Sequence, residues 1–415
     1  MKQINTLSSQ SFNDLIPELE QFGMHLGLER IKRALKDLGG PSQDIPAIQI
    51  IGTNGKGSIA SFLQSIFKIA NIHTGVYTSP HLISWCERIQ VDKELISPTD
   101  LRTFLTKIKQ IAEKHKLTPF EYVTATAFDY FSTRNVDLLV LEAGLGGRLD
   151  ATSIHPNRKI IAIASIGLDH CQHLGNSLQE ISKEKTAAIP NDAIVISGPQ
   201  HPQVAEIIQK ETEIKKATLK WVSKVPKEWK LGLRGEIQRQ NAAVAKAVIE
   251  AISLIGWNIS KEEIKTGLSQ ASWPGRMQFA TWRGLPVVID GAHNPHAAKQ
   301  LSIERAALTE QDTSTCWILG IQSHKQGPEI LRYLLKPGDK AWIVPIPGHS
   351  HWQQRQLSEA CQDLKNQLIS AKSAEDALCK IFSMGHWPSP PPLIAGSLYL
   401  LGNLLATGII KQSSQ

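Results

Sequence analysis

The segment with the clearest chemical potential is a glycine-rich stretch, GTNGKGS at residues 52–58, between an apolar run and an amphipathic stretch. Glycines let backbone N–H groups converge on phosphate oxygens, and the N-terminus of a following helix adds positive potential. Lys56 can neutralise a terminal phosphate, and the hydroxyl of Ser58 can approach a magnesium ion. Because Gly57 separates Lys56 from Ser58, the segment departs from the usual pattern GxxxxGK[ST]. We still expect a phosphate-binding turn rather than an ordinary glycine-rich connection.

A second polar segment follows the strongly apolar run Val136–Glu142, which reads as a buried strand. Glu142 would stand at the carboxyl end of that strand, where ligands gather in parallel sheets and where a carboxylate can hold magnesium. The glycines that follow, together with Arg148, can form a flexible substrate loop. The alternative is a capped turn whose charges face the solvent.

Three further polar residues are ambiguous on spacing alone. Ser79 lies in TSPHL directly after a predicted strand, but Ser-Pro also commonly opens a turn. His170 ends the segment LDH, and a lone histidine is as often a satisfied polar residue as a ligand. Lys185 follows Glu184 in a predicted helix, where an exposed ion pair is the simpler interpretation.

The last polar motif, DGAHNP, begins at Asp290 directly after the apolar run PVVI and includes His293. It lies downstream of SWPGR, where Pro274 and Gly275 interrupt the pattern before strands and helices resume. We therefore place a domain boundary there, with domains at residues 1–273 and 274–415. Polar groups at a strand end near such a boundary suit ligand binding, although a tight capped turn is the alternative.

Short apolar runs alternate with longer amphipathic segments, which predicts an α/β fold with mostly parallel strands. In the first domain, helices are expected at about 58–70, 101–115, 120–131, 178–189, 203–215, 241–255 and 261–269. In the second, they are expected at about 296–308, 328–335, 353–364 and 374–382.

Composition narrows the class of protein. The 415 residues are 41% hydrophobic and 20% charged, which is typical of globular chains and long enough for two domains. The five cysteines form no CxxC pair, so neither a disulfide framework nor a zinc cage is expected. No signal-like N-terminus and no apolar run of membrane-spanning length is evident, which favours a cytoplasmic protein without membrane partners. The formal net charge of +7 suits a small polyanion as well as nucleic acid, and no basic run favours the latter.

Taken together and in order, these motifs resemble the folylpolyglutamate synthase/dihydrofolate synthase family of the ATP-dependent Mur ligase superfamily. The matching segments are GTNGKGS, YTSPHL, VLEAGLGGRLDAT, LDH with a later EKTAAI, RQNAAVA, WPGR, DGAHNP and GSLYLLG. The resemblance implies a P-loop-NTPase-like Mur-ligase central domain followed by a smaller Rossmann-like α/β domain that carries glutamate ligation. It also implies ATP and Mg²⁺ as cofactors, and a monomer that acts on L-glutamate with folate or dihydropteroate.

The resemblance also implies roles for individual residues. Catalysis would involve Lys56, Lys185 and His293, and Lys185 matches a lysine that is carbamylated in the family. The ATP-binding residues would be Gly52, Thr53, Asn54, Gly55, Lys56, Gly57, Ser58, Asn241, Arg276 and Asp290. The magnesium ligands would be Ser58, Ser79, Glu142, His170 and the Lys185 carbamate, and the substrate side would hold Arg148 and Asp150.

Two departures from the family pattern stand out. The family often has His-Gln before the NA motif, where this chain has Ile237-Gln238, and its EKAGI is EKTAAI here.

Three other functions stay open at this point. They are a peptidoglycan-type Mur ligase acting on a UDP-sugar peptide, a P-loop ATPase that makes no amide bond, and a nucleic-acid-binding protein suggested only by charge.

Overall fold

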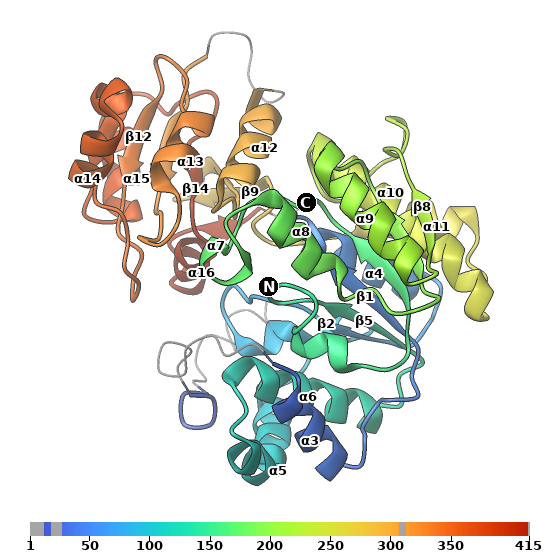
Figure 1. Ribbon diagram of the computed structural model, residues 1–415. Helices are drawn as coiled ribbons and strands as arrows, with labels where there is room; N and C mark the ends of the chain where they lie inside the picture. Colours follow the sequence, from blue (N-terminus) through green and yellow to red (C-terminus); the bar gives the residue numbers. More distant parts are fainter. Residues whose placement is uncertain (1–11, 18–26, 307–312, 414–415) are drawn as a thin grey trace. The chain divides into compact units, whose positions relative to one another are not determined.

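The structure is a computed structural model that describes residues 12–17, 27–306 and 313–413. It divides into two compact units, shown in Figure 1. Unit 1 contains the chain up to Leu233 and the stretch Ile237–Trp273. Unit 2 contains Pro274 onward and also the three residues Arg234–Glu236, which interrupt unit 1 in the sequence. The functional names of the two domains stay predictions.

Within the described residues, unit 1 is built on an eight-stranded sheet in the order β4-β3-β2-β5-β1-β6-β7-β8. The six strands from β2 to β8 in that order run parallel, and β3 and β4 add an antiparallel edge. The strands are β1 Ala47–Ile51, β2 Thr74–Tyr77, β3 Ile89–Val91, β4 Glu94–Leu95, β5 Leu138–Glu142, β6 Arg158–Ile163, β7 Ile194–Ser197 and β8 Thr218–Trp221.

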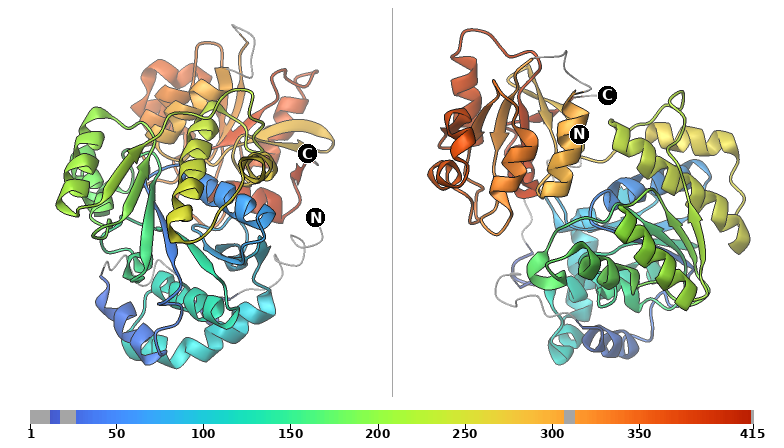
Figure 2. Two further views of the ribbon diagram at one scale, coloured as in Figure 1. Left: turned by 90° about the vertical axis from the view of Figure 1, so that its right-hand side faces the viewer. Right: turned by 45° about the horizontal axis from the view of Figure 1, so that its top comes forward.

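Helices cover both faces of this sheet, as Figures 1 and 2 show. Side chains alternate along a strand, so Ile48 and Ile50 face one core while Ala47 and Ile51 face the other side. One face carries α4 Lys56–Ile69, α10 Glu236–Ala251 and α11 Lys261–Gln270. The other carries α3 Glu29–Asp37, α5 Pro98–His115, α6 Pro119–Thr133, α8 Leu178–Thr186 and α9 Pro202–Ile214. The short α7, Cys171–Leu174, precedes α8.

Local signals in the sequence explain where several helices begin. Ser97 and Thr118 cap α5 and α6 through their hydroxyls, and proline occupies the first turn of each helix. Ser177 caps α8 in the same way, with Glu180 closing a capping box. Strand β1 is buried along its whole length, as expected for a central strand of a parallel sheet.

In the described part of unit 2, a seven-stranded sheet has the order β13-β12-β11-β14-β10-β9-β15. Strands β13 to β10 in that order are parallel, and β9 and β15 form an antiparallel edge. The strands are β9 Gln278–Trp282, β10 Leu285–Ile289, β11 Cys316–Leu319, β12 Lys340–Ile343, β13 Leu368–Ser370, β14 Leu393–Ala395 and β15 Lys411–Gln412. The helices are α12 Pro295–Ala306, α13 Gly327–Leu334, α14 Gln354–Ala360, α15 Ala374–Phe382 and α16 Leu398–Ala406.

The predicted α/β fold with two mostly parallel sheets is confirmed, but some element boundaries differ. The helix expected at 241–255 begins five residues earlier, at Glu236, and gives way to a 3-10 turn at Ile252–Ile255. The helix expected at 353–364 breaks at Cys361, whose φ of −131° is not helical, and continues as the 3-10 segment Gln362–Gln367. The end of the helix expected at 296–308 lies outside the described residues beyond Ala306. Short edge strands, such as β4 and β15, were not predicted.

A buried ion pair anchors α12 within unit 2. The guanidinium of Arg305 binds both carboxylate oxygens of Asp339, at 2.9 and 2.8 Å. The same carboxylate accepts hydrogen bonds from the Thr315 amide and from the Trp317 indole. A paired charge with this many donors is satisfied in the interior, so this network fixes the direction of α12. In the described ranges, no helix is long and apolar enough to cross a membrane.

Candidate active site

The predicted motifs of unit 1 come together at one edge of its sheet. Strands β2, β5, β1 and β6 are consecutive neighbours, and all four run parallel. Glu142 is the last residue of β5, and Ser79, the 52–58 segment and His170 follow β2, β1 and β6. Since the carboxyl ends of parallel strands meet at the same edge, the topology brings together residues that lie up to 118 positions apart in the sequence.

The 52–58 segment contains the tight turn after β1 and the first residues of α4. Gly52 and Gly55 have φ values of 138° and 96°, a region that side chains other than glycine rarely adopt. A Cβ added at Gly52 would lie 2.8 Å from the Cβ of Ala164, so the loop also packs too closely for a side chain. Helix α4 begins at Lys56, which leaves the helix N-terminus directed at the loop.

The loop after β6 holds this turn in place. The backbone amides of Thr53 and Asn54 donate to the carbonyl oxygen of Ser165 at 2.8 and 3.2 Å. The Ser165 hydroxyl donates back to the Asn54 carbonyl at 3.0 Å, and the Thr53 hydroxyl donates to the Gly167 carbonyl at 2.9 Å. Ser165 and Gly167 were not singled out from the sequence, because nothing local marks a residue whose role is to brace a distant loop.

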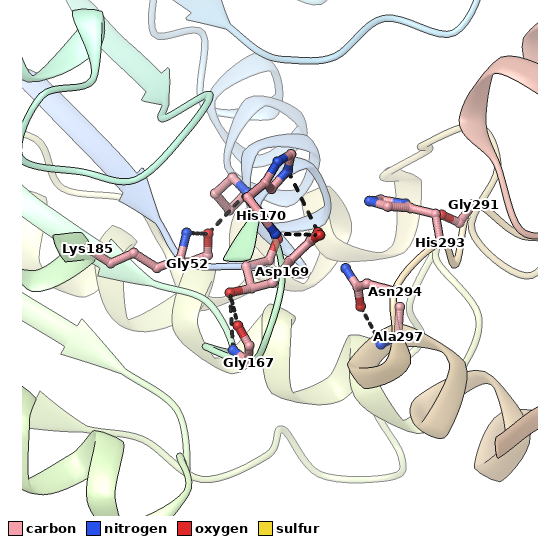
Figure 3. Close-up of polar contacts among 11 residues, drawn as sticks. Gly52, Gly167, Asp169, His170, Lys185, Gly291, His293, Asn294 and Ala297 are labelled. Carbon is pink, nitrogen blue, oxygen red and sulfur yellow. Dashed lines mark hydrogen bonds and ion pairs between the residues drawn. The ribbon is translucent and has the colours of Figure 1, made fainter. Parts of the chain in front are cut away.

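Two lysines converge on the carbonyl oxygen of Gly52. Lys185 Nζ donates to it at 2.9 Å and Lys56 Nζ donates at 3.2 Å, with a second bond from Lys56 to the Thr53 carbonyl. Figure 3 shows the side chain of Lys185 reaching Gly52. Lys185 is 5% exposed, so the exposed ion pair considered from the sequence is wrong for this residue.

The environment of Lys185 disfavours its ammonium form. Burial lowers the pKa of Lys185 to about 7, and the positive charge of Lys56 acts in the same direction. The carboxylates of Asp169, Asp150 and Glu184 oppose this decrease only in part. Near neutral pH, a substantial fraction of Lys185 is therefore a neutral amine, which is the nucleophilic form of the group.

Two buried hydroxyls lie in the segments that follow β1 and β2. Ser58 Oγ and Ser79 Oγ are both buried and have no hydrogen-bond partner among the described residues. The Ser79 amide donates to Glu142 Oε2 at 3.2 Å, which places the carboxylate beside that serine. A buried hydroxyl without a partner is costly in a folded protein, so such atoms commonly await a ligand.

His170 lies at the end of the loop after β6 and adopts a left-handed backbone conformation, with φ 52°. Its Nε2 lies 3.8 Å from Asp169 Oδ2, and its amide donates to Asp169 Oδ1 at 2.9 Å, as Figure 3 shows. Asp169 is buried, whereas the imidazole is partly exposed. The histidine is thus oriented by its neighbour and remains accessible to a ligand.

The glycine-rich loop after β5 packs on helix α8. A Cβ added at Gly147 would lie 2.4 Å from the carbonyl oxygen of Lys185, and the Arg148 guanidinium binds Glu184 at 3.1 Å. The Asp150 carboxylate is buried and accepts hydrogen bonds from the backbone amides of Gly144, Leu145 and Thr152. Burial raises the pKa of Asp150, although these donors oppose the shift. The Asp150 carboxylate therefore holds the backbone of this loop in place through hydrogen bonds.

Two residues from distant segments border the turn at residues 52–58. Asn241 in α10 lies close enough to Gly55 that an added Cβ would be 2.7 Å from its Oδ1, and Gln238 fixes the Asn241 amide at 3.0 Å. The indole of Trp273 lies on Gly57, 2.8 Å from where a Cβ would stand. Asn241 was expected near the nucleotide. Trp273 was not, because a tryptophan in a sequence usually indicates a residue of the hydrophobic core.

In unit 2, the DGAHN motif follows β10 and precedes α12. The carboxylate of Asp290 accepts hydrogen bonds from the amides of Met277 and Ala292, at 2.9 and 2.8 Å. Burial raises the pKa of Asp290, and the charge of Arg276 opposes that shift. His293 Nδ1 lies 2.8 Å from the Gly291 carbonyl. Asn294 caps α12 by accepting the Ala297 amide, as Figure 3 shows.

The predicted magnesium site can be tested against these contacts. Across the described ranges, no group of three or more histidine, cysteine or acidic side chains could hold a metal ion. Magnesium, however, is often bound by one or two protein oxygens together with phosphates and waters. The unpartnered hydroxyl of Ser79 beside the Glu142 carboxylate, and that of Ser58 at the start of α4, are oxygens of this kind, so the residues present suit Mg²⁺.

Comparisons with known proteins identify the family of this chain. The family profile described as dihydrofolate synthetase, C-terminal domain, matches residues 276–407. A probable dihydrofolate synthetase of Schizosaccharomyces pombe is 30% identical over 92% of this chain and 98% of its own length. The chain belongs to the dihydrofolate synthase/folylpolyglutamate synthase family. It is therefore an ATP-dependent ligase acting on folates and glutamate.

Other relatives of this folate ligase agree. The dihydrofolate synthase/folylpolyglutamate synthase of Escherichia coli is 30% identical, with 84% of each chain covered. The solved Mycobacterium tuberculosis folylpolyglutamate synthase, complexed with ADP and AMPPCP, superposes with a TM-score of 0.85 at 26% identity, over 96% of this chain and 97% of that one. E. coli FolC in complex with DHPP and ADP gives a TM-score of 0.82 at 26% identity, over 97% and 96%. A peptidoglycan-type ligase and a simple ATPase are therefore not supported.

Proposed function

We propose that this ligase is bifunctional and adds L-glutamate to dihydropteroate and to reduced folates. The observation that carries the assignment of its chemistry is the pair of lysines on the Gly52 carbonyl, together with two unpartnered serine hydroxyls in the segments after β1 and β2. Support for two acceptors comes from the relatives. A fungal protein named dihydrofolate synthetase and an E. coli protein with both names each match most of this chain.

The chemistry begins with a carboxylate that does not react with amines at neutral pH. Transfer of the γ-phosphoryl group of ATP to one carboxylate oxygen breaks the bond to ADP and makes an acyl phosphate. The glutamate amine attacks the acyl carbon, phosphate leaves with the bonding electrons, and the amine loses a proton. Catalysis of such transfers is mostly positioning and charge neutralisation, the role we assign to Lys56 and the amides of the 52–58 turn.

We assign magnesium binding to Ser58, Ser79, Glu142 and His170. The ion would neutralise charge on the phosphate oxygens, which lowers the barrier to attack by an anionic carboxylate. The serines bring neutral oxygens, and Glu142 is buried at the end of β5, where it can supply a negative charge. Asp169 would orient His170 for this role.

Lys185 is proposed to act as a carbamate. Its neutral amine would attack CO₂, form an N–C bond and release one proton, and the pKa of about 7 makes this form available near neutral pH. The product is an anion, which would turn the repulsion from Lys56 into attraction. The carbamate oxygens could then share in holding magnesium, as the family resemblance implies.

The remaining assignments concern nucleotide and substrate. Asn241 beside Gly55, together with Arg276 and Asp290 of unit 2, is proposed to bind ATP. His293 is proposed to act near the phosphoryl group, and Arg148 to face the substrate. Asp150 would serve the substrate side by holding the loop that carries Arg148. A monomeric state and a cytoplasmic location stay predictions.

The test is ADP release by the purified protein with Mg-ATP and L-glutamate, run with dihydropteroate, with tetrahydrofolate and with neither. Turnover with both acceptors and none without establishes the bifunctional ligase. Turnover with only one acceptor limits the enzyme to that reaction. Equal ADP release in all three reactions would contradict ligation and indicate simple ATP hydrolysis.

A further inference from the structure

Strand β1 lies inside the unit 1 sheet, between β5 and β6, and is buried along its whole length, yet one of its five residues is polar. That residue is Gln49, which is 0% exposed and stands between two isoleucines of the strand. A buried amide costs free energy unless its donors and its acceptor are hydrogen-bonded. The partners of Gln49 therefore indicate why a polar side chain can occupy this position.

The side-chain amide of Gln49 is hydrogen-bonded at both of its ends. Its Oε1 accepts from Arg158 Nη1 at 2.6 Å, and its Nε2 donates to the hydroxyls of Thr152 and Ser153 at 2.9 and 2.8 Å. These partners fix the orientation of the amide, because a flipped amide would turn its NH₂ group toward a guanidinium that has only donors. Gln49 thus has a donor side and an acceptor side that face different segments of unit 1.

On the donor side, hydrogen bonds continue from Gln49 into the glycine-rich loop after β5. The Thr152 hydroxyl donates its one proton to Asp150 Oδ1 at 2.6 Å, so it can only accept from Gln49. The other oxygen of the Asp150 carboxylate accepts the backbone amides of Gly144 and Leu145. The position of Gln49 is therefore passed to the start of the loop through hydrogen bonds that have a fixed direction.

A second branch on the donor side reaches the same loop where it packs on helix α8. The Ser153 hydroxyl, which accepts from the glutamine, donates to the Gly147 carbonyl at 2.6 Å. Gly147 lies against the backbone of Lys185, because a Cβ added to the glycine would stand 2.4 Å from the lysine carbonyl oxygen. The next amide, that of Arg148, donates to the Glu184 carbonyl of α8 at 3.0 Å. This branch therefore ends at the contact between the loop and the helix that carries Lys185.

On the acceptor side, Gln49 binds a guanidinium that also holds the chain just beyond the end of α8. Arg158 Nη1 donates to the Ala188 carbonyl at 2.6 Å, and its Nε donates to the His155 carbonyl at 2.9 Å. These two acceptors and the Gln49 oxygen are all neutral. Burial lowers the pKa of Arg158 to about 10, although the charge of Asp150 opposes the shift. The guanidinium is thus charged at neutral pH and is held by neutral oxygens, one of which Gln49 supplies.

From these contacts we propose that Gln49 is a positioning residue for the ligase reaction, because it ties the glycine-rich loop after β5 to the chain segment that ends helix α8. Gln49 is fully buried, so it acts through its hydrogen-bond partners and touches no substrate. Its network keeps Arg148 on the loop and Lys185 on α8 at a constant separation. Such precision matters because a displacement of about 1 Å can cost about 100-fold in rate. The proposal rests on the roles proposed above for Arg148, Asp150 and Lys185.

The test is Gln49→Glu in the full chain, which replaces the NH₂ group by an oxygen. The carboxylate keeps an acceptor for Arg158 and adds a charge that attracts the guanidinium, so Tm should fall by no more than about 4 °C. It has no donor for Thr152 and Ser153, so the loop loses both hydrogen bonds. The value of kcat/KM for the acceptor should therefore fall by about 10-fold to 100-fold, while KM for ATP changes less than about threefold. Wild-type kcat/KM in this variant would overturn the proposal.

Gln64→Glu is the matched control, since Gln64 is another buried glutamine of unit 1, and its amide donates to Gln90 Oε1 at 2.8 Å. The same change removes that donor and buries a charge, so Tm should fall at least as much as in Gln49→Glu. Because Gln64 has no bond to the glycine-rich loop, kcat/KM for the acceptor should stay at the wild-type value. An equal loss of kcat/KM in both variants would show a general effect of a buried charge and would reject the positioning role.

A pair of variants at Thr152 tests the same network if Gln49→Glu does not fold. Thr152→Val keeps the shape of the side chain but removes the hydroxyl that links Gln49 to Asp150, whereas Thr152→Ser keeps the hydroxyl. The valine variant should lose about 10-fold or more in kcat/KM for the acceptor, and the serine variant should retain most of it. Equal rates in the two variants would contradict the proposal, because the hydroxyl would then have no role.

Hydrogen exchange without substrate separates failure of the network from failure of the roles proposed for Arg148 and Lys185, because it needs no turnover. In Gln49→Glu, peptides covering 143–153 and 184–188 should exchange faster than in the wild type, while peptides from helix α5 should be unchanged. Wild-type exchange in both loop and helix peptides would reject the network, whatever the acceptor assays show. Faster exchange together with wild-type kcat/KM would show that the network holds the loop but does not position it for the reaction, which also overturns the proposal.

Discussion

Lys56 and Lys185 share one acceptor, the carbonyl oxygen of Gly52, at 3.2 and 2.9 Å. Two ammonium groups so close together repel each other, and burial adds to the cost of charging Lys185. The turn that we assign to ATP phosphates is therefore bordered by a lysine that is readily deprotonated. That property can be measured without any substrate.

The first prediction concerns the pH dependence of stability. In the unmodified protein, the pKa of Lys185 is about 7 when folded and near 10.5 when unfolded. Between these pH values the unfolded chain binds more protons, so Lys185 should make stability rise with pH, by up to about 1.4 kcal/mol per unit. Below about pH 7 this contribution to the slope vanishes. Lys185→Met should flatten the rise.

Urea denaturation of both proteins from pH 6 to 9 in CO₂-free buffer checks this result. Lys107→Met is a suitable control because that lysine is largely exposed. Equal slopes for the wild type and Lys185→Met would show that the lysine keeps an ordinary pKa.

The second prediction concerns the carbamate on Lys185. Adding bicarbonate near pH 7.5 should raise activity and should increase the mass of the native protein by one CO₂. Lys185→Arg should show neither effect, because a guanidinium stays protonated and is not carbamylated. We expect that variant to lose at least about 100-fold in kcat, the order of loss when a group that stabilises transition-state charge is removed. Full activity in rigorously CO₂-free buffer, with no added mass, would rule the carbamate out.

The third prediction concerns the unpartnered hydroxyls of Ser58 and Ser79. Replacing either serine by alanine should leave the free energy of unfolding unchanged or raise it by up to about 1 kcal/mol, since a buried hydroxyl without a partner is removed. Activity should fall and require more Mg²⁺ for half-saturation, because a proposed metal ligand is lost. Stability and activity thus change in opposite directions.

Ser61→Ala is the comparison for that pair of variants. The Ser61 hydroxyl donates to the Ser272 carbonyl at 2.9 Å, so its loss should lower stability by about 1 kcal/mol without changing the Mg²⁺ requirement. Magnesium titrations of activity, with thermal melts of each variant, measure both quantities. An unchanged Mg²⁺ requirement in both Ser58→Ala and Ser79→Ala would reject the site.

The fourth prediction concerns Gly147. Its Cβ would lie 2.4 Å from the Lys185 carbonyl oxygen, a backbone atom that cannot turn aside. Gly147→Ala should therefore displace the loop or helix α8, with a cost of about 1–3 kcal/mol in stability and a large loss of activity. Gly320→Ala offers a milder comparison, because there the nearest atoms are side-chain ends at 3.0 Å. Denaturation and ADP release measure the stability and the activity of both variants. Equal losses in Gly147→Ala and Gly320→Ala would contradict the prediction.

The fifth prediction concerns Asp150. Its carboxylate holds the amides of Gly144 and Leu145 with one oxygen, and the amide and hydroxyl of Thr152 with the other. Asparagine offers one acceptor oxygen instead of two, so Asp150→Asn should cost about 1–3 kcal/mol and loosen the glycine-rich loop. Activity should fall mainly through a higher KM for the acceptor, since Arg148 lies on that loop. A variant with wild-type stability would show that the hydrogen bonds do not hold the loop.

Several site residues were predictable because their signals are local. The turn at residues 52–58 combines glycines, a lysine and a serine between a strand and a helix, and each feature follows from its neighbours in the sequence. Glu142 was predictable as the last residue of a buried strand, because carboxyl ends of parallel strands collect ligands. The order of the motifs then identified the family.

Other features depend on neighbours that are distant in the sequence. Lys185 reads as an exposed helical lysine until Gly52, 133 positions away, is packed against it. The start of α10 at Glu236 was missed because the amide of that residue donates to the carboxylate of Glu304. No local sequence pattern indicates this hydrogen bond. The contact of Trp273 with Gly57 was missed for the same reason, because the two residues are distant in the sequence.

The sequence by itself therefore determined the fold class, the family and the set of polar residues at strand ends, since hydrophobic periodicity and turn chemistry are local properties of the chain. Only the tertiary structure decided which of those residues are buried and which hydroxyls lack partners. Burial and hydrogen-bond satisfaction are properties of packed neighbours, and chain segments become neighbours only when the sheets have formed.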